Sequence, residues 1–305
     1  MIHRLEGARA RLPGPVGVWA GSFRLKDTGL VSDAAAELDE LGYGVLWFPG
    51  GTSRTFDVAA TLLRGTRRSM VATGIANIWV NQPAEAARET SELNARYGNR
   101  FLLGLGVSHQ PMVERFRPGA WRSPLDAMTQ YLDELDRCRP VVPEQSRLLA
   151  ALGPKMLELA SSRSAGTHPY LVTPDQTAVI RDRIGPGALV AVEQGVVLDS
   201  DAARGRSTAR TALEMYLALP NYVSNWKRAG FTDNDVDNGG SDRLVDALIA
   251  RGSPEQVVSR LREHLHAGAD HVCLQVLTPS AATLPRAAWR ELASALELSD
   301  WATNR

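Results

Sequence analysis

The amino-acid sequence predicts an α/β fold, a (β/α)8 barrel with insertions after its fourth and seventh strands. Short runs of apolar and β-branched residues alternate with segments of helical period along the 305 residues, as is typical of a parallel sheet covered by helices. Eight such runs can be counted, the number that a barrel requires. A doubly wound sheet is the alternative, but it needs fewer strands and normally a glycine-rich first turn, which residues 20–24 do not supply.

The expected strands follow one another at similar spacings, except at two places. They occupy residues 16–19, 45–49, 70–78, 101–107, 147–152, 167–171, 189–198 and 271–277. The steps from the fourth strand to the fifth and from the seventh to the eighth are long, which indicates the two insertions. Because a barrel of this type usually takes about 250 residues plus insertions, we expect residues 1–305 to form one domain.

Turn and cap residues mark the helices between these strands. Gly42 follows an apolar helical face as a C-terminal stop, and Pro83 suits the first position of a helix that ends at Gly98. Thr173 and Ser253 each precede a glutamine by three positions, which is the capping-box pattern of a helix start. These signals support regular alternation of strand and helix.

Composition excludes several classes of protein. The 34 basic and 34 acidic residues cancel, so no excess charge favours nucleic acid or a membrane surface. Cys138 and Cys273 form neither a disulfide framework nor a zinc pattern. The metal-binding patterns HxH and HExxH are missing, so we expect no metal. The GxSxG nucleophile turn and the GxxxxGK[ST] phosphate loop are missing as well. Residues 1–6 are charged where a signal peptide needs its apolar region, and no apolar run is long enough to span a membrane, so a cytoplasmic protein is expected.

In such barrels the reacting groups lie at the carboxyl ends of the strands. Gly74 and Asn77, near the end of the third strand, indicate a close approach of ligand or backbone, and barrel packing explains the glycine equally well. After the fourth strand, His109 is a candidate general acid or base near neutral pH, although a single histidine is more often structural. Trp19, Trp47 and Trp79 end three early strands. They predict an aromatic pocket mouth for a planar cofactor, and ordinary barrel packing is the alternative.

The fifth strand leads into a helix start with features of an anion site. Gly153 at the cap and Pro154 in the first turn leave backbone N–H groups free at the positive end of the helix, and Lys155 adds charge. A plain strand-to-helix turn is the alternative. His168 and Tyr170, after the sixth strand, are expected mainly to close the barrel rim.

Several stretches together resemble the bacterial luciferase-like superfamily, in particular its oxidoreductases that depend on the deazaflavin coenzyme F420. They are residues 17–19, 72–79, 101–109, 151–156, 168–174 and 268–272. The resemblance covers nearly the whole chain and implies a TIM-like barrel, usually a homodimer, that holds the cofactor at the carboxyl ends of its strands. Only three of the 34 basic residues are lysines, a bias typical of GC-rich sources, in which deazaflavin is commonly made. This bias favours F420 over the alternative cofactor, FMN.

The resemblance assigns roles to individual positions. In relatives, a bulge on the third strand with a non-prolyl cis peptide backs the deazaflavin ring, which corresponds here to Ile75–Asn77, with the cis bond expected between Ile75 and Ala76. The loop after the fifth strand binds cofactor phosphate in the family. The implied cofactor-binding residues are Trp19, Ile75, Ala76, Asn77, Val107, Ser108, Ala151, Leu152, Gly153, Pro154, Lys155 and Met156.

The resemblance also implies a chemistry, hydride transfer between C5 of the deazaflavin and a small organic substrate, with His109 as the catalytic group that exchanges the proton. Sugar-phosphate dehydrogenase relatives carry Glu at this position, and the paired His and Trp that follow their first strand are replaced here by Ser22 and Phe23, so a sugar-phosphate substrate is not supported. An FMN-dependent monooxygenase and a non-catalytic binder of deazaflavin or flavin remain alternatives. The insertions are expected to cover the pocket with Trp121, Tyr131, Tyr216, Tyr222 and Trp226, and Arg54 and Arg163 are candidate partners of the acidic glutamate tail of F420.

Overall fold

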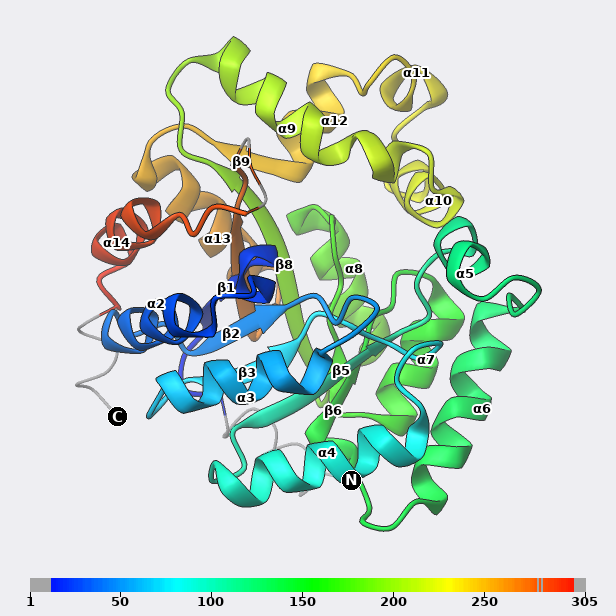
Figure 1. Cartoon of the computed structure of the whole chain (residues 1–305). Helices are drawn as coiled ribbons and strands as arrows, with labels where there is room; N and C mark the ends of the chain where they lie inside the picture. The colour runs from blue at the N-terminus through cyan, green and yellow to red at the C-terminus, as the bar shows by residue number, and fades with distance from the viewer. Residues whose placement is uncertain (1–11, 279, 281, 299–305) are drawn as a thin grey trace.

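A closed barrel of eight parallel strands forms the centre of the molecule (Figure 1). The computed structural model describes residues 12–278, 280 and 282–298, so the signal-peptide prediction for residues 1–6 lies outside the described residues. The barrel strands are β1 (Val16–Trp19), β2 (Val45–Phe48), β3 (Met70–Thr73), β5 (Phe101–Gly106), β6 (Arg147–Leu149), β7 (Gly166–Thr167), β8 (Leu189–Val197) and β10 (His271–Val276). β10 pairs with both β1 and β8, which closes the barrel. The predicted fold class is confirmed.

The third predicted strand is divided in two. β3 ends at Thr73, and β4 (Ala76–Asn77) continues beside β5 after a break at Gly74 and Ile75. At the break, the Thr73 hydroxyl donates to the Gly104 carbonyl at 2.7 Å and accepts from the Gly104 N–H at 2.8 Å. The side chain thus takes the place of backbone pairing, which the apolar pattern of the sequence does not reveal.

Three further strands differ from the prediction. β6 ends at Leu149 instead of the predicted residue 152, because its pairing with β5 and β7 stops there. β7 is shorter than the predicted 167–171, because Pro169 has no N–H to donate and Leu171 has a positive φ of 55°. β9 (Ile249–Arg251), which was not predicted, pairs with the carboxyl-terminal half of β8 from Gly195 onward. It lies outside the closed ring and extends the sheet beyond the barrel.

Helices cover the barrel on its outside. They are the 3-10 helices η1 (Gly21–Arg24) and η2 (Glu144–Ser146) and the α-helices α2 (Thr28–Glu40), α3 (Thr55–Gly65), α4 (Pro83–Arg96), α5 (Gln110–Phe116), α6 (Pro124–Arg137), α7 (Pro154–Arg163), α8 (Pro174–Ile184), α9 (Ala202–Leu217), α10 (Pro220–Arg228), α11 (Asp233–Val236), α12 (Asp242–Leu248), α13 (Pro254–His266) and α14 (Arg286–Ala295). The capping boxes predicted at Thr173 and Ser253 are both present, and Pro83 opens α4.

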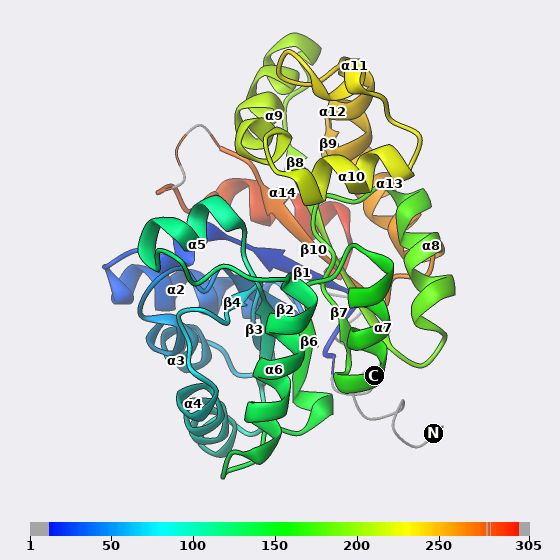
Figure 2. The ribbon, with the colours of Figure 1, turned by 90° about the vertical axis from the view of Figure 1, so that its right-hand side faces the viewer.

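Both predicted insertions are present. The first places α5 and its following loop between β5 and α6, and the second places α9–α12 and β9 between β8 and α13. Figures 1 and 2 show α9–α12 gathered at one end of the molecule, on the far side of the barrel from α4. His109, directly before α5, contacts Tyr222 of α10 with ring centroids 5.6 Å apart, so the two insertions meet.

The barrel interior is unusually polar. Trp47, fully buried, stacks on His168 with centroids 4.4 Å apart, and its indole N–H donates to Nε2 of His271 at 3.2 Å. Because that contact makes Nε2 an acceptor, Nδ1 of His271 is the donor to the Gly14 carbonyl, 3.0 Å away. Burial lowers the pKa of both His168 and His271 to about 4, so both rings are neutral at pH 7.

Candidate functional site

The break between β3 and β4 lies against Trp19 at the end of β1. The Trp19 indole N–H donates to the Gly74 carbonyl at 3.0 Å. A Cβ added at Gly74 would lie 2.6 Å from Nε1 of Trp19 and 2.9 Å from Nε2 of His168, so glycine alone fits here. The bond between Gly74 and Ile75 is a non-prolyl cis peptide, and the prediction of Ile75–Ala76 was wrong by one bond.

Asn77 holds the turn that follows the break. It is buried, its Oδ1 accepts from the backbone N–H of Trp79 at 2.9 Å, and its carbonyl accepts from the side chain of Asn81 at 2.9 Å. The amide oxygen of this implied cofactor-binding residue is therefore engaged within the chain. A hydrogen bond between an Asn side chain and a nearby backbone N–H competes with ligand binding, and it can be recognised only once the backbone conformation is known.

Glycine at the end of β5 brings three of the predicted stretches together. A Cβ at Gly106 would lie 2.5 Å from Cδ1 of Ile75 and 3.4 Å from Cβ of Ala150. Ile75 belongs to the break after β3, and Ala150 precedes the loop of Ala151 to Met156. The same strand end continues through Val107 and Ser108, which has a positive φ of 58°, to His109. The break, the end of β5 and the loop after β6 thus meet at one edge of the barrel.

His109 is half-buried at the start of α5. Burial lowers the pKa of its imidazole below the ordinary 6.5, and a hydrogen bond with the side chain of Asn221 opposes this shift. The Tyr222 ring lies beside it. A neutral imidazole at pH 7 can accept a proton, which is the property a general base needs.

The loop after β6 ends at an uncapped helix. Gly153 occupies the N-cap of α7 without a side-chain hydrogen bond to the helix, and Pro154 and Lys155 are exposed. The first-turn N–H groups of a helix have no partner within it, so those of Lys155 and Met156 are available to an anion. A Cβ at Gly153 would meet no atom within 4 Å, so the space in front of this helix end is open.

Aromatic side chains connect this edge with the second insertion. Tyr170 lies 5.9 Å from Trp19 between ring centroids, and its hydroxyl donates to Oε1 of Gln275 at 2.8 Å. Tyr216 and Tyr222, from α9 and α10, pack edge to face at 5.0 Å and both contact Tyr170. These residues extend over the carboxyl ends of the strands, in the place expected for a cover.

Three other aromatic residues named from the sequence are structural. Trp47 lies inside the barrel instead of at its mouth. Trp226 is fully buried and donates to the Leu171 carbonyl at 3.0 Å. The Tyr131 hydroxyl donates to the Asn81 carbonyl at 2.8 Å. Each of these indole or phenol groups, once buried, uses its polar atom to hold the chain.

Arg163 does not fit the role of a tail partner. It occupies the last turn of α7, and its guanidinium pairs with Asp133 at 3.0 Å and Asp136 at 2.8 Å. A helix that follows a barrel strand runs back along it, so its last turn is remote from the carboxyl ends of the strands. Arg54 is exposed at the start of α3, and its role stays a prediction.

Glu193 is a site residue that the sequence reasoning missed. It stands in the middle of β8 on the same face as Leu189 and Ala191, which belong to the barrel interior, and it is 1% exposed. Burial raises its pKa to about 8. Burial raises the pKa of Tyr170, Tyr216 and Tyr222, and a charge on Glu193 would add to this shift. Its carboxyl group accepts from the N–H of Leu171, next to Tyr170 of the aromatic cover. A single acidic residue inside an apolar strand was the signal that could have found it.

The described residues lack two further features. No helix within them has the length and apolar character needed to cross a membrane. Across residues 12–278, 280 and 282–298, no three His, Cys, Asp or Glu side chains are grouped so that they could hold a metal ion.

Comparison with known proteins gives the family. A model of the luciferase-like monooxygenase family matches residues 24–271. The chain belongs to this family. One relative is the 5,10-methylenetetrahydromethanopterin reductase of Archaeoglobus fulgidus, which is 22% identical over an alignment that covers 77% of this chain and 85% of the reductase.

Solved structures share the fold over nearly the full length. An F420-dependent secondary alcohol dehydrogenase, in complex with an F420–acetone adduct, superposes with a TM-score of 0.70 at 14% identity, covering 93% of this chain and 98% of that one. The EDTA monooxygenase of Chelativorans sp. BNC1 has a TM-score of 0.71 at 12% identity, with 94% and 97% covered. At these identities, the structures establish the fold alone.

Proposed function

We propose that this protein is an F420-dependent oxidoreductase that transfers a hydride between C5 of the deazaflavin and a small organic substrate. The observation that carries the proposal is the meeting of three chain segments at Gly106: the glycine break after β3, the strand end that leads to His109, and the loop that leads to the uncapped α7. The likeness in fold to the secondary alcohol dehydrogenase, which is named as F420-dependent, supports this choice of cofactor.

The residues present fit such a cofactor. The break at Gly74 and Ile75 is held against Trp19 and His168, and we propose its backbone as the wall behind the ring. Trp19, Ala76, Val107, Ser108, Ala151 and Leu152 complete the proposed cofactor surface around it. The open first turn of α7, with Gly153, Pro154, Lys155 and Met156, suits a phosphate group. When bound, the deazaflavin supplies the carbon that gives or takes the hydride.

The protein's own groups then handle orientation and the proton. His109, neutral at pH 7, accepts the proton released when a substrate alcohol or amine is oxidised, and returns it in the reverse direction. Tyr170, Tyr216 and Tyr222 exclude water from the same edge. We also propose that residues 1–305 form one domain that works as a cytoplasmic homodimer on a small-molecule substrate, as the resemblance implies.

An FMN-dependent monooxygenase is the second candidate. The likeness to the EDTA monooxygenase structure favours it, and FMN also ends its ribityl chain in a phosphate that the start of α7 suits equally. A non-catalytic binder of either cofactor is the third candidate, in which binding is retained without turnover.

Purification from an F420-producing host tests the proposal. We expect the protein to retain a cofactor with the absorbance of oxidised deazaflavin, which a reducing substrate bleaches. Retention of FMN would favour the monooxygenase, and tight deazaflavin binding without turnover on any substrate would favour the carrier.

A further inference from the structure

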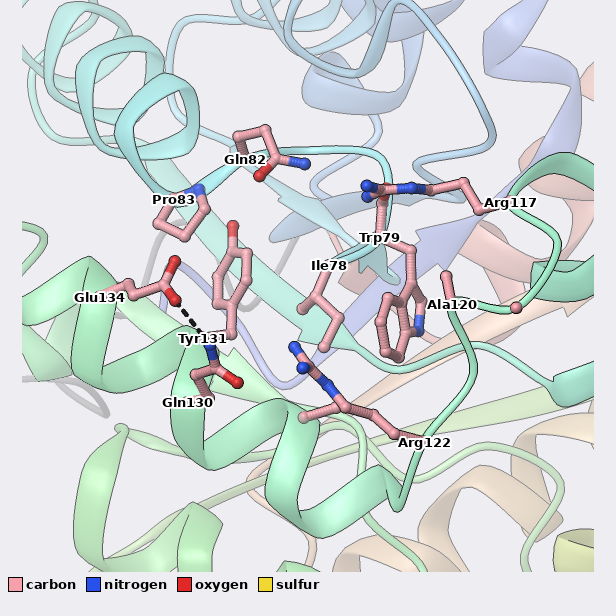
Figure 3. A pocket seen from close by; sticks show the side chains of 12 residues that line it. Ile78, Trp79, Gln82, Pro83, Arg117, Ala120, Arg122, Gln130, Tyr131 and Glu134 are labelled. Atoms are coloured by element: carbon pink, nitrogen blue, oxygen red, sulfur yellow. Dashed lines mark hydrogen bonds between the residues drawn. The ribbon is translucent and has the colours of Figure 1, made fainter.

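A pocket of about 400 Å3 lies outside the barrel, beside the chain that follows β4 (Figure 3). The first turn of α4, helix α6 and the loop between α5 and α6 enclose it. Its wall includes Trp79, which follows the end of β4 by two residues. The side chains that line it include Trp79, Gln82, Arg117, Arg122, Gln130 and Tyr131.

The walls of the pocket are held in place by hydrogen bonds. The Trp79 indole donates to the Val107 carbonyl at 2.8 Å, and the Tyr131 hydroxyl is held by Asn81. The loop that carries both arginines is closed by Glu114, whose two carboxylate oxygens accept from the N–H groups of Gly119 at 2.7 Å and Trp121 at 3.1 Å. The aromatic wall and the loop backbone are therefore fixed in advance, and the side chains of Arg117 and Arg122 lie exposed at the edge of the pocket.

Neither arginine is neutralised. Arg117 donates to the Trp79 carbonyl at 2.9 Å, and the Arg122 guanidinium lies over the Trp79 ring, 5.5 Å from its centroid. Among the described residues, neither forms an ion pair with a carboxylate, whereas arginines such as Arg163 do. Both guanidinium groups thus keep their capacity to bind carboxylates in a forked arrangement.

The opposite wall carries amide and carboxylate groups. Gln82 stands at the N-cap of α4 without a side-chain cap bond, and Nε2 of Gln130 donates to Glu134 at 3.0 Å. Burial raises the pKa of the Tyr131 phenol, and the nearby Cys138, Glu85 and Glu134 add to this shift. The pocket therefore offers two cations on one side and groups that accept or donate to amides on the other. This combination matches a chain of carboxylates joined by amide bonds.

The position of the pocket connects it with the proposed cofactor site. The N–H of Ile78 donates to the Gly106 carbonyl at 3.1 Å, and Trp79 is bonded to Val107, so the pocket and the proposed ring site share this stretch of chain. Helix α6 packs against both α4 and α7, which places the pocket one helix away from the proposed phosphate site at the start of α7.

We propose that this pocket binds the acidic glutamate tail of F420, with Arg117 and Arg122 holding its carboxylates and Gln82 and Gln130 its amides. The inference rests on the proposed function, because it requires the deazaflavin to occupy the barrel edge. It makes the first insertion responsible for binding the tail, in place of Arg163, which the resemblance offered as a candidate.

Binding titrations with two cofactor forms test the proposal. The full-length protein is titrated with F420 that carries several glutamates and with the form that lacks them, and the ratio of the two affinities is compared with that of Arg122→Ala and the double variant Arg117→Ala/Arg122→Ala. We expect the native protein to bind the tailed form about tenfold more tightly, a difference typical of charged hydrogen bonds. The variants should lower this ratio toward one without changing the affinity for the tail-less form.

Arg115→Ala is the control, because it removes one positive charge, as Arg122→Ala does, but outside the pocket. Arg115 lies on α5, is exposed and is not part of the pocket, so its removal should keep the ratio. Equal affinities for the two forms in the native protein, or a ratio that survives in the double variant, would overturn the proposal. If neither form binds, the proposed cofactor itself is contradicted, and the tail site is overturned with it.

Discussion

The side chain of Glu193 accepts a hydrogen bond from the backbone N–H of Leu171 at 3.3 Å, and this is its one hydrogen bond within the described residues. The second carboxyl oxygen, Oε1, is buried without a partner. Because a charge in this position would lack both water and a counterion, the neutral acid is favoured, in line with a pKa raised to about 8.

Glu193→Gln is expected to change the pH dependence of stability. The unfolded chain loses this proton near pH 4.5, whereas the folded chain keeps it until about pH 8. The free energy of unfolding therefore falls between these values as pH rises, by roughly 1 kcal/mol per pH unit, and is flat outside them. The variant, which cannot ionise, should lose this slope and exceed the native protein in stability at pH 8.

Denaturant titrations between pH 6.5 and 8 measure this effect. The buried His168, His264 and His271 have lowered pKa values, so they destabilise the fold only as pH falls below about 6.5, outside this window. Parallel stability curves for the two proteins across the window would show that Glu193 is already ionised.

Gly74→Ala is expected to destabilise the protein by about 1–3 kcal/mol, because its Cβ would overlap Trp19 and His168. Gly21→Ala is the matched control, since its Cβ would meet its nearest atom, Cζ3 of Trp19, at 4.0 Å. Chemical unfolding followed by circular dichroism compares the two. Similar losses for both would mean that the break after β3 tolerates a side chain.

His109→Ala is expected to lower hydride transfer by about 10²–10⁴-fold, the usual contribution of a positioned acid or base. With secondary alcohols as probe substrates, kcat/KM of the native enzyme should fall as pH drops through a pKa below 6.5, because protonated His109 is no longer a base. His266→Ala, which removes an exposed histidine, should leave both rate and profile unchanged. An unaltered rate in the His109 variant would remove this residue from the mechanism.

Lys155→Ala is expected to weaken cofactor binding severalfold and to reduce its dependence on salt, while leaving stability unchanged because the side chain is exposed. Lys227→Ala is the control, since Lys227 pairs with Asp233 on the second insertion. If the two variants bind the cofactor equally well, the start of α7 is not the phosphate site.

Much of the barrel could be predicted because its strands are short apolar runs, such as Val45–Phe48, bounded by clear turn residues. The break after β3 could not, because it depends on a contact of Thr73 with a residue 31 positions away. Trp19 and Trp47 look alike in the sequence and are register partners on β1 and β2, yet the Trp19 indole donates to the carbonyl of Gly74 and the Trp47 indole to His271. Only the closed sheet determines this difference. Glu193 stands out in the sequence as an ionisable residue in an apolar run, but whether it is buried depends on which face of β8 turns inward.

Competitive titration with F420 and FMN tests the central claim most directly. We expect the purified protein to bind F420 more tightly than FMN, and Gly74→Ala to weaken the binding of F420. Tighter binding of FMN, or no binding of either cofactor by the folded protein, would contradict it.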